Sequence, residues 1–358
     1  MDSIISGRIV LPDRVIEGSI EIEDGRIKRI ESTGSAGSRI IAPGLIDIHI
    51  HGCHGKSVMK GEIDEISEHL AEHGVTSFLP TTITAPEESL RSVVKIASAL
   101  MGKEKGSNIL GVNLEGPWVS RDKPGAQPLE HIRKGSIEEF ERINNGCVRI
   151  ITLAPEENMS IIKELSERCI VSLGHSNADY ETAKRAIELG AKLSTHTFNT
   201  MRPLHHREPG LVGAVLEDER VYCEFIPDFV HLHPALIKLI WRAKGEDRAI
   251  AITDGTEASG LEDGVYDLSL GKITVSKGRA VREDGTIAGS AIILDSCIKN
   301  LYSIGFSLCD IFRVASFNPS ELLGLKNKGR IAEGADADLV LLDKDLNIEK
   351  VFIKGVER

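Results

Sequence analysis

Pro43-Gly44-Leu45-Ile46-Asp47-Ile48-His49-Ile50-His51-Gly52 is the stretch that decides the fold. Its run Leu45–Ile50 is short and mostly apolar, which is typical of a β-strand buried on both faces. Side chains alternate along a strand, so His49 and His51 lie on the same face. Two neutral imidazoles side by side supply half of a transition-metal site. They could equally be ordinary polar residues at a strand end, so further ligands must be sought elsewhere in the chain.

Strand-like runs continue after this stretch, and helical patterns separate most of them. The expected strands are Leu45–Ile50, Val75–Leu79, Ile109–Leu114, Val148–Leu153, Ile170–Leu173, Lys192–Thr195, Val221–Phe225 and Ala249–Thr253. The expected helices between them include Glu62–His73, Pro86–Met101, Ser160–Arg168, Tyr180–Leu189 and Pro234–Ala243. Eight strands joined mainly by helices predict an α/β fold, a closed (β/α)8 barrel of the TIM type. An open doubly wound sheet is disfavoured because no glycine-rich dinucleotide fingerprint follows the first strand.

Both ends of the chain have a β texture instead. Alternating runs cover Ser6–Val10, Gly18–Ile22 and Arg26–Ile30, and the tail contains Ala337–Leu342 and Val351–Ile353. We therefore expect residues 1–42 and 328–358 to form one small β-sandwich domain, with the barrel spanning residues 43–327. After the last barrel strand, the sequence predicts a hairpin at Tyr266–Val275 and helices at Ile292–Tyr302 and Asp310–Ser316.

Composition limits the possible partners. The 358 residues are 41% hydrophobic and 27% charged, which is ordinary for a globular protein with a sizeable core. A net charge of -11 argues against binding to nucleic acid or to an anionic membrane surface. The six cysteines are scattered without a C-x-x-C pair, which favours reduced thiols. The first residues do not have a signal-peptide pattern and no apolar run reaches membrane-spanning length, so we expect a cytoplasmic protein.

Residues of metal-binding type stand at the ends of the expected barrel strands. These residues are His49 and His51 at the end of the first strand, Glu115 after the third, His175 after the fifth, His196 after the sixth and Asp254 after the eighth. Active sites of such barrels lie at this end of the strands. Histidine and carboxylate ligands without a thiolate suit Zn²⁺ or Fe²⁺ in an open, catalytic site.

A metal of this kind lowers the pKa of bound water toward neutrality and polarises a carbonyl group. Hydrolysis also needs a base that takes the proton of water and returns it to the leaving group. Asp254 is the candidate for this base. The alternative for Asp254 is a turn residue that caps the backbone before Gly255.

Several motifs together resemble a known family. The opening stretch is similar to that of the amidohydrolase superfamily, as is the tail Gly329-Arg330-Ile331-Ala332-Glu333-Gly334-Ala335-Asp336-Ala337-Asp338-Leu339-Val340. Four further motifs narrow the resemblance to the family of N-acetylglucosamine-6-phosphate deacetylases. These motifs are Leu114-Glu115-Gly116-Pro117, Leu173-Gly174-His175-Ser176, Thr195-His196-Thr197-Phe198-Asn199-Thr200-Met201 and Arg207-Glu208-Pro209-Gly210.

The resemblance implies an enzyme that converts N-acetyl-D-glucosamine 6-phosphate and water to D-glucosamine 6-phosphate and acetate. It implies that Glu115, His175 and His196 hold a divalent metal, Zn²⁺ or Fe²⁺, and that Asp254 is the general acid and base. Some members of this family keep two first-strand histidines and bind a second metal. Because His49 and His51 are present here, the resemblance implies one or two metals per subunit.

Substrate contacts are also implied by the resemblance. The residues concerned are Ala126, Gln127, Asn199, Thr200, Arg207, Asp228, Phe229, Val230, His231, Ile287, Ala288 and Gly289. Arg207 is expected to reach the sugar phosphate bound by the neighbouring subunit of a homodimer, and the guanidinium fork suits a phosphate. His231 is expected to orient the acetamide. Gln127 replaces the usual histidine and Thr200 replaces a smaller residue, so contacts at these two positions are expected to differ.

The sequence is compatible with two other functions. The chain could be a cyclic-amide hydrolase or a deaminase of the same superfamily, but many of those carry a carboxylated lysine after strand four. Here strand four runs into Ala154-Pro155-Glu156, which disfavours that branch. A barrel that has lost its chemistry and serves as a scaffold is disfavoured because the expected ligands and Asp254 are all retained.

Overall fold

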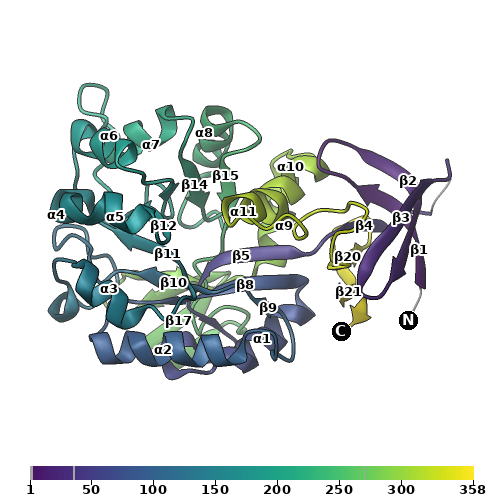
Figure 1. The fold of residues 1–358 in the computed structure, drawn as a ribbon, viewed down its shortest axis with the longest axis horizontal. Helices are drawn as coiled ribbons and strands as arrows, with labels where there is room; N and C mark the ends of the chain where they lie inside the picture. The colour runs from purple at the N-terminus through teal and green to yellow at the C-terminus, as the bar shows by residue number, and fades with distance from the viewer. Residues whose placement is uncertain (1–2, 35–36, 270) are drawn as a thin grey trace.

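A computed structural model describes residues 3–34, 37–269 and 271–358 of the chain. Its centre is a parallel sheet that curves into a barrel (Figure 1). The strands in spatial order are β5 (Leu45–Ile50), β8 (Val75–Thr82), β10 (Val112–Glu115), β11 (Val148–Leu153), β12 (Ile170–Leu173), β13 (Leu193–Ser194), β14 (Tyr222–Phe225) and β15 (Ala249–Ala251). The short strand β9 (Asn108–Ile109) also pairs with β8. The predicted barrel is confirmed.

The barrel closes where the segment after β15 pairs with the first strand, β5. Ile50 and Gly255 form a parallel bridge, and the backbone N–H of Asp254 donates to the carbonyl oxygen of His49 at 2.9 Å. Deeper in this seam, the Thr253 hydroxyl donates to the buried Asp47 carboxylate at 2.6 Å. The seam therefore brings the first and last strands of the barrel together beside His49 and Asp254.

Helices cover the outside of the barrel (Figure 1). They are α1 (Ile63–Glu72), α2 (Glu87–Leu100), α3 (Ile137–Ile143), α4 (Pro155–Asn158), α5 (Ile162–Ser166), α6 (Tyr180–Glu188), α7 (Gly210–Glu217), α8 (Pro234–Lys244), α9 (Leu294–Ser303), α10 (Leu308–Phe312) and α11 (Asn318–Leu322). Shorter turns are η1 (Val58–Lys60), η2 (Leu129–His131), η3 (Met159–Ile161) and the π-helical turn η4 (Arg313–Phe317). The helix expected at 160–168 is therefore divided into η3 and α5. The one expected at 310–316 is divided into α10 and η4.

Strands from both chain ends form one seven-stranded sheet beside the barrel. Its order is β22 (Val356–Glu357), β21 (Ile348–Ile353), β20 (Leu339–Leu342), β4 (Ile40–Pro43), β1 (Ser3–Val10), β2 (Val15–Glu23) and β3 (Arg26–Ser32). Strand β4 connects the two chain ends because it pairs parallel with β1 and antiparallel with β20. Ile9, Ile20, Ile41 and Leu339 belong to the apolar core of this sheet. The division into domains after residue 42 and before residue 328 stays a prediction.

A buried ion cluster lies next to the terminal sheet. The Lys328 ammonium is 2.6 Å from Asp338 Oδ2 and 3.0 Å from Asp336 Oδ2. All three residues are less than a tenth exposed. Asp336 also accepts a hydrogen bond from the Asn327 amide, and Asp338 accepts one from the backbone N–H of Lys354. The two carboxylates therefore have a permanent cation and further donors as partners.

A third sheet follows the barrel and extends the predicted hairpin. It consists of β16 (Gly264–Leu268), β17 (Gly271–Ser276), β18 (Arg279–Arg282) and β19 (Ile287–Ser290), in that order. Ser290 bridges Gly255, which attaches this sheet to the end of the barrel seam. A small hairpin of β6 (Gly52–Cys53) and β7 (Lys56–Ser57) comes directly after His51.

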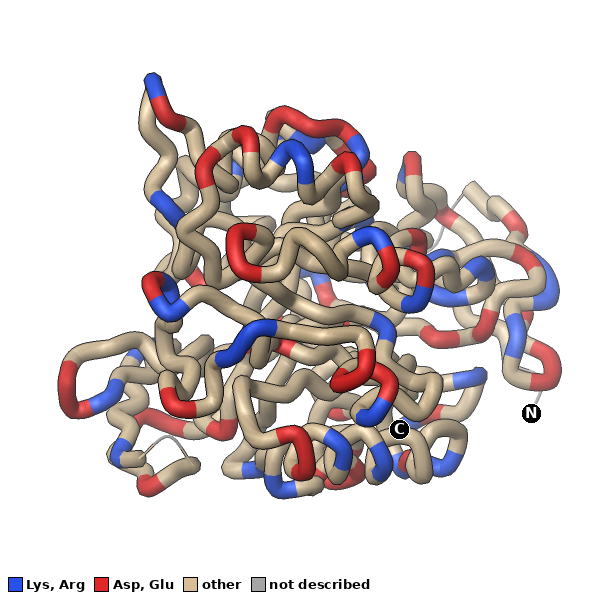
Figure 2. The backbone as a smooth tube through the Cα atoms, turned by 60° about the vertical axis from the view of Figure 1, so that its left-hand side comes forward, with Lys and Arg blue, Asp and Glu red and all other residues tan. Residues whose placement is uncertain are grey.

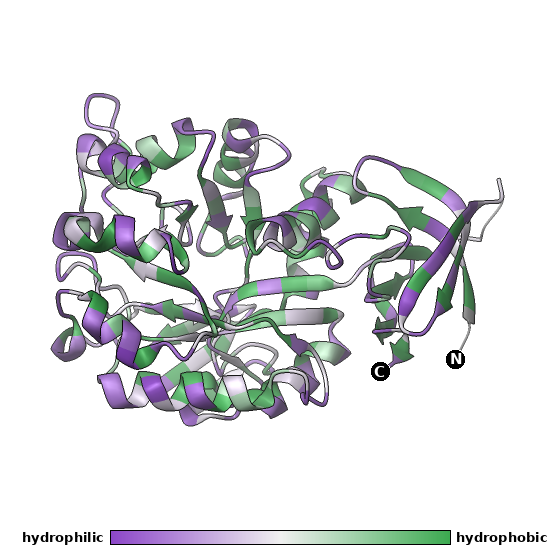
Figure 3. Cartoon of the chain, in the orientation of Figure 1, coloured by the Kyte–Doolittle hydropathy of each residue, from purple (hydrophilic) through white to green (hydrophobic). Residues whose placement is uncertain are grey.

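Lys and Arg residues are interspersed with Asp and Glu residues along the backbone (Figure 2). Hydrophobic residues concentrate along the barrel strands, and hydrophilic ones on the outward faces of the helices (Figure 3). Across the described ranges, no helix combines the length and apolar character that crossing a bilayer requires. All six cysteines are free thiols.

Candidate active site

The carboxyl ends of the barrel strands bring the six predicted metal-site residues to one place. His49 lies in β5 and Glu115 ends β10, whereas His51, His175, His196 and Asp254 directly follow strands or lie shortly after them. His175, His196 and Asp254 have φ angles of 47°, 27° and 50°, in the left-handed region. Residues other than glycine rarely adopt this backbone conformation. Where they do, they are concentrated at functional sites.

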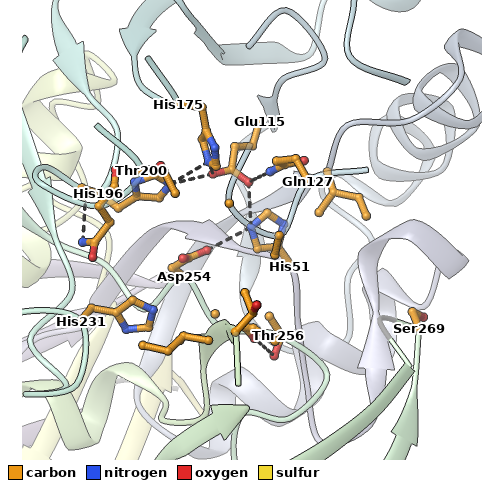
Figure 4. A pocket seen from close by; sticks show the side chains of 18 of the residues that line it. His51, Glu115, Gln127, His175, His196, Thr200, His231, Asp254, Thr256 and Ser269 are labelled. Carbon is orange, nitrogen blue, oxygen red and sulfur yellow. Dashed lines mark hydrogen bonds and ion pairs between the residues drawn. The ribbon is translucent and has the colours of Figure 1, made fainter. Parts of the chain in front are cut away.

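Glu115, His175 and His196 form a tight group on one side of the barrel mouth (Figure 4). Glu115 Oε1 lies 3.0 Å from His175 Nε2 and 2.9 Å from His196 Nε2. The two ring nitrogens are 3.1 Å apart. All three residues are buried. One carboxylate oxygen and two imidazole nitrogens that converge in this way are a donor set suited to a divalent transition metal.

His49, His51 and Asp254 form a second group that adjoins the first. His51 Nε2 lies 3.1 Å from Asp254 Oδ1 and 3.3 Å from Glu115 Oε2. His49 Nε2 lies 3.5 Å from both Glu115 Oε1 and Asp254 Oδ1, is buried and makes no hydrogen bond. A buried nitrogen lone pair between two carboxylates fits a cation-binding position. Glu115 faces both groups with its two oxygens, so it could bridge two metals.

Hydrogen bonds on the far side of the rings orient them toward the shared centre. The Nδ1–H groups of His51 and His175 donate to the backbone carbonyl oxygens of Thr81 and Lys123, each at 3.1 Å. Because a carbonyl can only accept, these contacts place a ring proton on Nδ1, so in the neutral ring Nε2 carries the lone pair that a metal would bind. This second contact is typical of metal-binding histidines.

Buried carboxylates dominate the electrostatics of the mouth. Burial disfavours the charged form of His49, but the charges of Glu224 and Glu115 raise its pKa well above the usual value. Burial also disfavours the charged form of His51, but hydrogen bonds to Asp254 and Glu115 outweigh it and raise the pKa of His51 to about 9. The pKa of Glu115 is held well below its usual value because the charges of His175 and His49 outweigh burial. The carboxylates of the barrel mouth therefore stabilise a positive charge placed between them.

A cavity of about 310 Å³ opens directly onto the two groups. Its walls include the predicted residues Ala126, Gln127, Asn199, Thr200, His231, Ile287, Ala288 and Gly289, together with His51, Glu115, His175, His196 and Asp254. Cavities of this size hold small molecules such as sugars. Among the described residues that line it, none is Lys or Arg.

Four of the predicted substrate residues do not line the cavity: Arg207, Asp228, Phe229 and Val230. Asp228 instead holds His231, because its Oδ2 is 2.6 Å from His231 Nδ1 and its Oδ1 accepts the backbone N–H of His231 at 2.9 Å. Arg207 lies in an exposed loop before α7, where its guanidinium contacts His206.

Gln127 takes part in the first group. Its Nε2 donates to Glu115 Oε2 at 2.5 Å, and its Oε1 accepts the backbone N–H of Thr84 at 2.7 Å. Gln127 therefore fixes the Glu115 carboxylate as well as lining the cavity. The Thr200 hydroxyl donates to the neighbouring carbonyl of Asn199 at 2.7 Å.

The sequence alone did not identify Glu224. Its carboxylate lies in β14, is fully buried, and is 3.1 Å from His49 Nδ1. A carboxylate within the otherwise apolar run Tyr222–Phe225 was the available signal. The cavity walls also include Ser57, Met59, Ile83, Thr256, Glu257, Ser269 and Thr286, which no motif indicated.

Comparisons with known proteins agree with this geometry. A model of the amidohydrolase family matches residues 40–358. The chain is 36% identical over 373 residues to an N-acetylglucosamine-6-phosphate deacetylase of Bacillus subtilis, covering 97% of this chain and 94% of the relative. It is 34% identical over 352 residues to an N-acetylgalactosamine-6-phosphate deacetylase of Escherichia coli O157:H7, covering 94% and 93%. The crystal structure of an N-acetylglucosamine-6-phosphate deacetylase from Thermotoga maritima superposes with a TM-score of 0.94 at 37% identity, covering 99% of both chains.

Proposed function

The chain belongs to the amidohydrolase family, and from this premise we propose that it hydrolyses the acetamide of N-acetyl-D-glucosamine 6-phosphate. Water is consumed, the C–N bond of the amide breaks, and D-glucosamine 6-phosphate and acetate are released. The observation that carries the proposal is the convergence of two ligand groups on Glu115 beside a cavity of about 310 Å³.

We assign the metal to these groups. Glu115, His175 and His196 would hold one divalent ion, Zn²⁺ or Fe²⁺, and His49 and His51 would contribute to a second. Such an ion acts as a Lewis acid that polarises the amide carbonyl and acidifies water. The buried Nε2 of His49, which has no hydrogen-bond partner, supports the fit.

The protein's own groups would move the proton and hold the substrate. Asp254 Oδ1 lies within 3.5 Å of both His49 and His51 and faces the cavity, so it can accept the proton of the attacking water. It then returns that proton to the leaving amine. His231, braced by Asp228, can donate a hydrogen bond to the acetamide oxygen. Its pKa is raised because the hydrogen bond to Asp228 outweighs burial, which favours the donor form.

A phosphate needs positive charge that the described cavity walls do not supply. We therefore propose that the active unit is a homodimer in which Arg207 of the partner subunit reaches the phosphate. Arg207 supports this role because it is exposed and its guanidinium contacts His206 rather than any acidic residue that the structure describes. We also propose a cytoplasmic location, which six free thiols support.

A second candidate substrate is N-acetyl-D-galactosamine 6-phosphate. It differs from the first in configuration at one ring carbon, and the E. coli relative named for it is 34% identical to this chain, as is the Danio rerio relative named for the first. The same metal groups and the same Asp254 would serve both sugars, so only the wall of the cavity would discriminate between them.

Acetate release from a panel of N-acetyl sugars and their 6-phosphates tests the proposal. We expect the highest kcat/KM for N-acetylglucosamine 6-phosphate, and a higher value for the galactosamine epimer would favour the second candidate. Asp254→Asn should lower kcat by about 10²–10⁴-fold while the metal of the Glu115, His175 and His196 group is retained. Near-normal turnover by a folded, metal-loaded Asp254→Asn enzyme would contradict the proton-transfer role.

Mixed dimers test the role of Arg207. Arg207→Ala should raise KM for the phosphorylated sugar far more than for the unphosphorylated one. If Arg207 acts across the dimer, equal mixing of Arg207→Ala and Asp254→Asn subunits should restore about a quarter of the wild-type sites, since half of randomly paired dimers would contain one complete site. Failure to recover activity from subunits that exchange freely would assign Arg207 to its own subunit or to no role.

A further inference from the structure

Three histidines gather at a second place in the molecule, away from the cavity walls. His54 lies at the tip of the β6–β7 hairpin, His69 lies in α1, and His73 directly follows α1. His69 and His73 are four residues apart and therefore lie on the same side of the helix end. This H-x3-H spacing is common in zinc sites.

The hairpin holds the His54 ring in a narrow slot. His54 and Gly55 have φ angles of 48° and 78°, as a two-residue type I′ turn requires. The backbone N–H of His54 donates to the carbonyl oxygen of Ser259 at 2.7 Å. A Cβ atom on Gly260 would lie only 2.5 Å from His54 Nε2, so only glycine leaves room for the ring on that side. The His69 ring stacks on His54 with centroids 4.5 Å apart.

The nitrogens of His54 and His73 are spaced as two ligands of one metal would be. His54 Nε2 and His73 Nε2 are 3.3 Å apart. Two imidazole nitrogens at ~2.1 Å from a tetrahedral zinc ion are separated by about 3.4 Å. A neutral pair of histidines sharing one proton has a similar distance, so the surroundings must decide between the two explanations.

Those surroundings resemble the outer shell of a metal ligand. His73 Nδ1 lies 3.0 Å from Asp295 Oδ2, at the start of α9. A carboxylate on the far nitrogen orients a histidine and increases its basicity as a ligand. His69 Nδ1 is buried without a hydrogen-bond partner, and its nearest carboxylate, Glu72 Oε2, is 4.0 Å away.

We propose that His54 and His73 bind a transition-metal ion of the zinc type, with His69 as the third ligand. His69 would turn its ring from the stacked position to reach the ion, and water would complete a tetrahedral site. This site is separate from the two groups at the barrel mouth and does not depend on them.

Such an ion would join three parts of the fold. The hairpin that carries His54 begins after His51 and ends at Ser57, and both of these residues line the cavity. Helices α1 and α9 supply the other contacts. The ion would therefore brace one wall of the cavity from behind without touching the substrate.

Zinc content tests the proposal. Purified full-length protein would be equilibrated with buffered Zn²⁺ and compared with His54→Asn, His73→Gln and a control, His131→Asn. Asparagine tolerates the positive φ of position 54, so the turn is preserved. We expect His54→Asn and His73→Gln each to bind one zinc ion fewer per chain than the wild type and the control.

Chemical modification with diethylpyrocarbonate provides a readout for each site. Zinc should protect His54 and His73 of the wild type from modification, as mapped by mass spectrometry, and should not change the modification of His131. The variants should retain kcat, because they leave the mouth intact. Equal zinc content in all four proteins, or equal modification of His54 and His73 with and without zinc, would overturn the proposal.

Discussion

The barrel mouth and the terminal sheet both bury pairs of carboxylates, but they neutralise them with different cations. Beside the sheet, Asp336 and Asp338 share the ammonium of Lys328, which is charged at any physiological pH. At the mouth, the cations that Glu115 and Asp254 face among the described residues are imidazoles, which can lose their charge. A permanent partner gives a static ion cluster, whereas exchangeable partners leave a place where a metal can bind. The chemical nature of the cation thus separates a structural cluster from a reactive one.

The strongest test of this contrast is Glu115→Gln. Gln keeps the shape of the side chain but removes the charge that both ligand groups share. We expect loss of bound metal and a fall in kcat of about 10³-fold or more, since the metal supplies several kcal/mol of transition-state stabilisation. The melting temperature of the metal-free protein should not fall. Full metal content together with normal turnover would remove Glu115 from the site.

The matching change beside the sheet is Lys328→Met. It leaves Asp336 and Asp338 buried without their cation, which should reduce the free energy of unfolding by about 3–5 kcal/mol. Urea denaturation measures this loss, and kcat per folded molecule should stay the same. As a control, adding Asp336→Asn and Asp338→Asn to Lys328→Met should recover part of the stability. A fall in kcat without a fall in stability would contradict the contrast.

Removal of metal should separate the two regions again. At a free metal concentration of 100 times Kd, binding stabilises the folded state by about 2.7 kcal/mol. A chelator should therefore lower the melting temperature of the wild type. The distant Lys328→Met variant should show the same metal-dependent shift, since separated sites act additively. Glu115→Gln should lose the part of this shift that comes from metal bound at the barrel mouth. A shift as large as that of the wild type in Glu115→Gln would argue against the assignment.

The smallest effect concerns pH. Burial disfavours the Lys328 ammonium, but the charges of Asp338 and Asp336 outweigh it and raise the pKa of Lys328 above its usual value. The folded state therefore keeps its proton to higher pH than the unfolded state. This contribution is complete below the unfolded pKa of about 10.4 and declines as pH rises through the folded pKa, by at most about 1.4 kcal/mol per pH unit. The stability gap between wild type and Lys328→Met should be constant from pH 7 to 9 and shrink above that range.

Much of the barrel could be predicted because its strands are apolar runs between turn residues. Val148–Leu153 and Ile170–Leu173 have the predicted bounds. The six metal-site residues could be grouped because parallel strands place their carboxyl ends at one edge. Strands β18 and β19 were not predicted, although Glu283-Asp284-Gly285 between them is of the same turn type as Glu23-Asp24-Gly25, which joins β2 to β3. Their alternation is hidden because the buried positions of these two strands carry only the small residues Ala280, Ala288 and Ser290.

Other features depend on contacts between distant residues and were out of reach of the sequence. The left-handed backbone of His175 and Asp254 aims their side chains into the mouth, and no residue type dictates it. In the sequence, Glu224 is only a charged residue within an apolar strand. Its role becomes visible in the structure, where its carboxylate lies 3.1 Å from His49 Nδ1. The hydrogen bond from Gln127 to Glu115 links a loop residue to a strand end. The sequence therefore showed that glutamine replaces the usual histidine at position 127, but it could not show which residue this glutamine contacts.

The seam of the barrel has a consequence for biosynthesis. His51 and Asp254, which meet across it, are separated by 203 positions in the chain. During translation the first histidines leave the ribosome long before Asp254 is made. We therefore expect a nascent chain to acquire its full set of metal-site residues only after the last strand has docked. Proteins truncated before residue 254 should remain without deacetylase activity, so premature release cannot yield a partly working enzyme.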